Sequence, residues 1–195
     1  MASLRAIGPQ DIVDFWFGED AAALQQRRAL WFSKQPTFDD EIRRRFQAVY
    51  LQAAADGLQA WKGTAPGCLA LILLLDQFPR NMFRSSAKAF ATDTLALAIA
   101  QQTLRCGFDE QLTPLQRMFV YLPFEHCEDL RQQQRSLELF GQLAGEPEMQ
   151  GVIDYALRHY EVIRRFGRFP HRNALLSRAS TAQELEFLRQ PDSGF

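Results

Sequence analysis

One stretch of the sequence restricts the fold more than any other: residues 68–75 are apolar without interruption, and Asp76 ends the run. Pro66 suits the first turn of a helix, while the residue before Pro79 is pushed out of helical geometry. The spacing therefore predicts a helix from Pro66 to about Phe78 that is apolar nearly all round. Such a helix belongs in the middle of a fold, and its apolar run is far shorter than the roughly 20 residues that span a membrane.

The rest of the 195 residues also follow the helical period, and no convincing alternating strand appears. Gly and Pro separate the periodic segments at short intervals, which favours antiparallel neighbours. We expect eight to ten helices in antiparallel hairpins, forming one all-α domain over residues 1–195, with 190–195 as a frayed tail. The expected segments are 11–17, 21–32, 37–57, 66–78, 93–107, one from 114, 123–144, 148–166 and one after 181.

Composition excludes several classes of protein. An apolar fraction of 47% is ample for a core, and a net charge of -1 gives no support for a nucleic-acid binder. Three widely spaced Cys form no disulfide framework or zinc pattern, and residues 1–10 carry no apolar secretory segment. We expect a cytoplasmic protein without membrane or nucleic-acid partners. The 22 basic side chains include 19 Arg, whose planar forks suit carboxylates and phosphates.

Three segments differ from plain core. In the first, residues 73–84, the apolar helix ends in Asp76, Arg80 and Asn81. A buried helix that ends in charges places them at a rim or an internal cavity. The alternative is a capping turn, in which Arg80 bonds the last carbonyls and Asn81 tolerates an unusual backbone conformation.

The second segment is residues 121–134. On one continuous helix, His126, Asp129 and Gln133 share a polar stripe, so Asp129 would orient the His126 imidazole as a base-orienting carboxylate does. Glu125 lies beside this stripe as a further acid–base candidate. Alternatively, the acids only complement the dipole of the first helical turn.

The third segment, residues 158–178, holds six Arg against one acid. Around Pro170, a turn of alternating Phe and polar side chains is typical of an anion-binding loop anchored in the core. Arg165 either joins this set or forms an ordinary i, i+4 pair with Glu161. The alternative for the other Arg is structural pairing with the acids of the second segment. The polar members of the turn are Arg168, His171, Arg172 and Asn173.

Other chemistry lacks its motifs. The sequence has no His-Glu-x-x-His pattern and no Gly-rich phosphate loop, so we expect neither a metal nor a cofactor. His159 fits a satisfied core histidine. Cys127 follows His126 directly, and successive helical residues point about 100° apart, so the two would not form a catalytic pair.

Four strings resemble the bacterial domain-of-unknown-function family 924 over nearly the whole chain: Asp14–Gly18, Leu75–Asn81, Pro123–Asp129, and Phe166–Asn173 followed by Ser180-Thr181. The family is similar in fold to the tetratricopeptide-like helical superfamily, which implies a right-handed array of helical hairpins. The resemblance implies no activity. Residues 176–178 read Leu-Ser-Arg where the family usually reads Leu-Gly-Arg, so Ser177 is assigned no role that needs a glycine turn.

The leading hypothesis is a pocket that binds a small anionic molecule, with acid–base chemistry by His126 as an option. The alternative is a peptide- or protein-binding scaffold without catalysis, and a third reading is a polar core in which the acids and bases neutralise one another. The candidate catalytic residues are Glu125, His126 and Asp129; the candidate ligand-binding residues are Arg80, Asn81, Arg165, Arg168, His171, Arg172 and Asn173.

Overall fold

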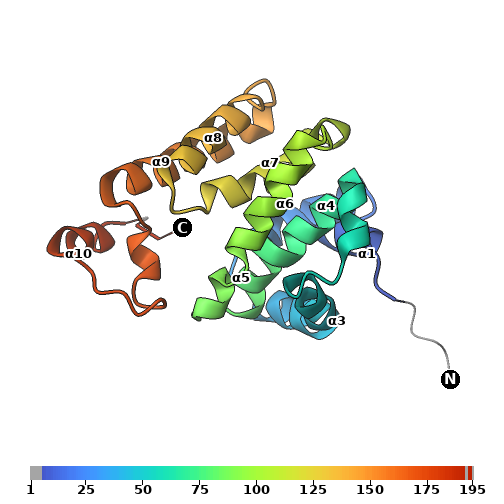
Figure 1. Cartoon of the computed structure of the whole chain (residues 1–195), viewed down its shortest axis with the longest axis horizontal. Coiled ribbons are helices and arrows are strands. Elements are labelled where there is room, and N and C mark those ends of the chain that lie inside the picture. The colour runs from blue at the N-terminus through green and yellow to red at the C-terminus, as the bar shows by residue number, and fades with distance from the viewer. Residues whose placement is uncertain (1–5, 192, 195) are drawn as a thin grey trace.

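The computed structural model describes residues 6–191 and 193–194, and within these ranges it contains helices and no strand (Figure 1). Because α4 and α5 form one continuous helix, the described part agrees with the expected eight to ten helices. Its α-helices are α1 (Pro9–Phe17), α2 (Ala21–Trp31), α3 (Pro36–Ala54), α4 (Ala65–Ile72), α5 (Phe78–Met82), α6 (Asp93–Arg105), α7 (Pro114–Glu125), α8 (Leu130–Gly141), α9 (Gln150–Phe166) and α10 (Ala182–Leu188).

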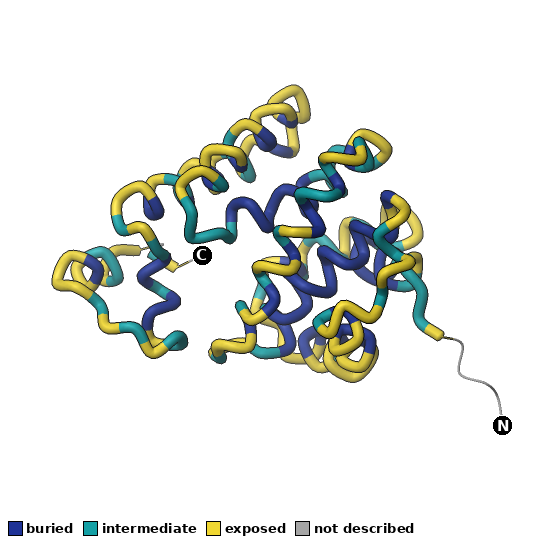
Figure 2. The backbone as a smooth tube through the Cα atoms, viewed as in Figure 1, coloured by how far each residue is buried: buried dark blue, intermediate teal, exposed yellow. Residues whose placement is uncertain are grey.

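The apolar run forms the centre of the molecule, as predicted. Every residue from 67 to 79 is buried, and the helix packs against α1, α3, α6 and α7 (Figure 2). The expected end near Phe78 is wrong, because a π-helical turn, η2 (Leu73–Gln77), joins α4 to α5. The Phe78 N–H bonds the Leu73 carbonyl, five residues back. The wider turn lets the chain pass Pro79, which has no N–H to donate, without leaving the helix.

Aromatic side chains join the N-terminal helices to this centre. Trp16 of α1 stacks on Trp31 of α2 at a centroid distance of 5.9 Å, and the Trp31 indole N–H donates to the Trp16 carbonyl at 2.9 Å. Phe78 lies within 6.0 Å of Phe15 and 5.1 Å of Phe46. Such ring pairs each add about 1 kcal/mol beyond the area they bury.

The predicted helix over 123–144 is wrong. Pro123 lies inside the last turn of α7, which ends at Glu125, and α8 begins only at Leu130. Pro123 has no N–H to donate to the carbonyl four residues back and its ring crowds that carbonyl, which favours an early end of α7. Asp129, in extended backbone geometry, then caps a new helix. This break, between two helices that the sequence suggested were one, places His126 in a connection.

The C-terminal part forms a smaller apolar cluster of its own, made by Val162 and Ile163 of α9 together with Phe169. The helix α9 pairs with α8 along the chain (Figure 1). The expected frayed tail over 190–195 falls partly outside the described residues. No helix among the described residues is long and apolar enough to cross a membrane.

Candidate functional site

The π turn carries Asp76 into the middle of the protein, where its side chain is fully buried. Three groups surround the carboxylate: Gln77 Nε2 donates to it at 2.6 Å, His126 Nδ1 lies at 2.8 Å, and Arg80 Nη1 forms an ion pair with it at 3.2 Å. Burial alone would raise the pKa of Asp76. The positive charge of Arg80 and the contact with His126 outweigh the effect of burial and hold that pKa well below its usual range. Asp76 is therefore a fixed negative charge at neutral pH.

His126 ends α7 as its C-cap, and its ring is set by Asp76, 50 residues earlier. Burial and the nearby Arg80 lower the pKa of His126 despite the opposing effect of Asp76. The ring is then neutral at pH 7, with its proton on Nδ1 donated to Asp76 and a lone pair on Nε2. A histidine held in one tautomer by a buried carboxylate is the arrangement of a general base.

Two guanidiniums meet at Asp93, in the first turn of α6. Arg80 binds its carboxylate with two hydrogen bonds of 2.9 and 3.0 Å, and Arg172 adds one of 3.2 Å. Arg172 comes from η6 (Pro170–Arg172) and lies between the rings of Phe90 and Phe169, at 4.6 and 4.5 Å from their centroids. Burial and the charge of Arg80 lower the pKa of Arg172 to about 10, so it stays cationic at neutral pH.

Arg172 is only 6% exposed, yet its side chain forms a single hydrogen bond within the part of the chain that the structure describes. Its Nε is buried with no hydrogen-bond partner there. A guanidinium has five N–H donors, and leaving buried donors unsatisfied costs free energy. Arg172 is thus a buried cation, near the Asp76–His126 pair, with N–H donors that have no partner among the described residues.

A second acid lies behind His126. Burial, together with the charge of Asp76, raises the pKa of Glu125 to about 8, so this carboxyl is protonated at neutral pH. One of its oxygens is 3.2 Å from Nδ1 of His159, whose ring lies 6.3 Å from that of His126. Burial lowers the pKa of His159 to about 3 and that of His171 to about 4. Asp76 and Glu125 therefore hold opposite protonation states a short distance apart, a pattern typical of acid–base sites.

The family match accounts for nearly the whole chain. The model of a family described as bacterial protein of unknown function (DUF924) matches residues 12–192. The chain belongs to this family. A solved structure of a protein of unknown function from Agrobacterium tumefaciens is 40% identical, with a TM-score of 0.84 over 93% of this chain and 96% of that one. No curated protein matches.

Of the predicted site residues in this DUF924 chain, five gather around the Asp76 carboxylate and its neighbours. Asp129 does not, and the prediction that it orients His126 is wrong. Its carboxylate instead accepts the backbone N–H groups of Arg131 and Gln132 at 3.0 Å as the N-cap of α8. Because α7 ends before His126, the two residues do not share a helical face. The five are Arg80, His126 and Arg172, which contact Asp76 or Asp93 directly, and Glu125 and His171, whose pKa values respond to the charges of this group.

The two predicted Asn side chains have structural partners elsewhere. Asn81 donates to buried Asp39 at 2.8 Å, and Arg84 binds the same carboxylate. Asn173 donates to Ser180 at 3.0 Å and accepts from Arg178 at 3.0 Å. Neither amide bonds a member of the group around Asp76, which we call the Asp76 network. Its members are Asp76, Arg80, Asp93, Glu125, His126, His171 and Arg172.

Two of the predicted Arg also lie apart. Arg168 binds Glu184 of α10 through two hydrogen bonds of 2.6 and 2.8 Å. Arg165 lies over the ring of Phe166, and the expected pair with Glu161 is made by Arg164 instead. The sequence thus grouped Arg residues that the fold divides between the surroundings of Asp76 and the surface formed by α9 and α10.

Sequence reasoning missed the role of three residues. Asp76 carried a signal, because it is the acid that ends the longest apolar run. Asp93 was expected only at a helix start, and His159 only in the core; their acid–base neighbours come from other helices. Among the described residues, no group of three or more His, Cys, Asp or Glu could hold a metal ion.

Proposed function

We propose that the Asp76 network binds a small molecule carrying a carboxylate or phosphate, and that His126 exchanges a proton with it. The observation that carries the proposal is Arg172, a nearly buried cation with unused donors. Planar guanidinium forks bind such anions through paired hydrogen bonds. Arg80, which shares Asp93 with Arg172, supplies the second positive charge.

Charges within the network support an anionic ligand. At neutral pH, Asp76 and Asp93 balance Arg80 and Arg172, while Glu125 is protonated because of its raised pKa. The charged carboxylates that a bound anion meets, those of Asp76 and Asp93, are therefore already paired with guanidiniums. The Nε2 atom of neutral His126 accepts a proton from the ligand. The fixed charge of Asp76 stabilises the imidazolium that forms.

The first experiment is a thermal-shift screen of the full chain against inorganic phosphate, acetate, succinate and citrate at millimolar concentration. At least one anion should raise Tm, because a ligand that binds the folded state stabilises it. Arg80→Gln should remove the shift. Arg168→Gln is the matched control, because that guanidinium lies on Glu184, and it should keep the shift.

A long-range proton–nitrogen NMR spectrum then tests the base. His126 should carry its proton on Nδ1 at pH 7, and the bound anion should move its Nε2 signal. The proposal is overturned if no anion raises Tm, or if Arg168→Gln removes the shift as fully as Arg80→Gln does.

The tetratricopeptide-like hairpin array and the cytoplasmic location stay predictions.

A further inference from the structure

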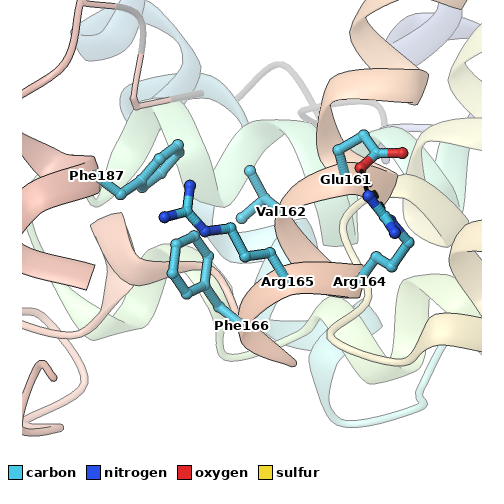
Figure 3. A pocket seen from close by; sticks show the side chains of 6 residues that line it. All are labelled: Glu161, Val162, Arg164, Arg165, Phe166 and Phe187. Atoms are coloured by element: carbon cyan, nitrogen blue, oxygen red, sulfur yellow. Dashed lines mark hydrogen bonds and ion pairs between the residues drawn. The ribbon is translucent and has the colours of Figure 1, made fainter. Parts of the chain in front are cut away.

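A second, separate feature lies on the surface formed by α9 and α10. It is a pocket of about 350 Å³, a size at the lower end of small-molecule sites. Figure 3 shows the side chain of Arg165 reaching between the rings of Phe166 and Phe187. The residues that line the pocket are Glu161, Val162, Arg164, Arg165, Phe166 and Phe187.

The charges of this pocket are unevenly matched. Arg164 binds Glu161 one helical turn away through hydrogen bonds of 2.9 and 2.6 Å, so this pair is neutral. Arg165 has no acidic partner within the described part of the chain, and its guanidinium lies 4.6 Å from the centroid of the Phe166 ring. The pocket therefore carries one positive charge that its own side chains leave unneutralised.

The other half of the lining is apolar. The rings of Phe166 and Phe187 are 5.2 Å apart with their planes inclined by 50°, and they join α9 to α10. Val162, which is buried, extends the apolar surface along α9. Two inclined aromatic rings favour a third ring against their faces or edges, and an Arg fork beside them favours a carboxylate.

We propose that this pocket binds a small aromatic monocarboxylate, with its ring against Phe166 and Phe187 and its carboxylate on Arg165. The ligand class differs from that of the buried network, because two apolar walls and one cation suit a molecule with one charge and a ring. The pocket is independent of the Asp76 network, since none of its lining residues contributes a contact there.

The test is an NMR titration of the ¹⁵N-labelled full chain with 4-phenylbutyrate. Saturable shifts should appear at the backbone amides of residues 161–166 and at Phe187 below about 10 mM. The neutral 4-phenylbutyramide should bind at least about tenfold more weakly because it lacks the charge, and butyrate likewise because it lacks the ring. Equal binding of the amide, or shifts confined to the neighbours of Arg172, overturns the proposal.

Variants of the exposed cation complete the test. Arg165→Met keeps the length of the side chain but removes its charge, and should weaken 4-phenylbutyrate at least about tenfold; Arg165→Lys should restore part of the loss. The control is Arg131→Met, an 89% exposed Arg on α8 that should bind as the parent does. If Arg165→Met binds as tightly as the parent, the carboxylate does not lie on Arg165 and the proposal is wrong.

Discussion

The buried carboxyl of Glu125 should make the stability of the protein fall as the pH rises. Its pKa is about 8 in the folded protein and has an ordinary value of 4.5. Between these values the folded chain holds a proton that the unfolded chain has released, and this contribution is fully present below pH 4.5 and lost as the pH passes 8. The loss is about 1.4 kcal/mol per pH unit, which accumulates to about 3 kcal/mol by pH 7.

Glu125→Gln removes the titrating group and keeps an oxygen that can face Nδ1 of His159. The variant should gain stability relative to the parent as the pH rises, by about 3 kcal/mol between pH 5.5 and 7.5, and the gain should level off above pH 8. Urea unfolding followed by tryptophan fluorescence measures both proteins at each pH. The lowered pKa values of the histidines make stability rise with pH in the acidic range. Subtracting the stability curve of one protein from that of the other cancels this contribution, because both proteins share it.

The control is Glu138→Gln on α8, since that carboxylate is 63% exposed and pairs with Arg135 at the surface. Its stability difference from the parent should stay flat over the same pH range. A flat difference for Glu125→Gln as well would refute the reasoning, because it would mean that the buried carboxyl is not protonated at neutral pH.

Three further substitutions test the local assignments. Asp76→Asn removes the fully buried charge that faces Arg80 and His126, leaves Arg80 paired with Asp93 alone, and should lower the free energy of unfolding by about 2 kcal/mol in urea titrations; a loss below about 1 kcal/mol, a surface value, would contradict this. Ser177 has a φ of 54°, the left-handed region that favours glycine, so Ser177→Gly should raise stability by about 0.5–1 kcal/mol, and an unchanged Tm would argue against strain. Asp129→Ala should cost about 1 kcal/mol through the lost cap of α8 while the NMR titration of His126 stays as in the parent; a shifted titration would make Asp129 its orienting group after all.

The Ser177 position also shows where the local preference of a residue fails to predict the backbone. A serine argued against a left-handed turn, but the backbone of Ser177 adopts that conformation. Neighbouring contacts, such as the Arg178 N–H to the Asn173 carbonyl at 2.8 Å, hold the chain in this conformation. Tertiary context has overridden a local preference, at a cost that the proposed substitution measures.

The sequence by itself determined the all-helical class, the family and the central position of the 68–75 run, because helical period and apolar burial depend on near neighbours along the chain. It also placed Arg80, His126 and Arg172 among the residues of interest. Only the tertiary structure decided their partners: Asp76 lies 50 residues from His126, and Asp93 lies 79 from Arg172. A carboxylate shifts the pKa of a group within a few ångströms of it in space, whatever its distance along the chain. Spacing along one supposed helix therefore predicted Asp129 as the carboxylate that orients His126, whereas in the structure that carboxylate is Asp76.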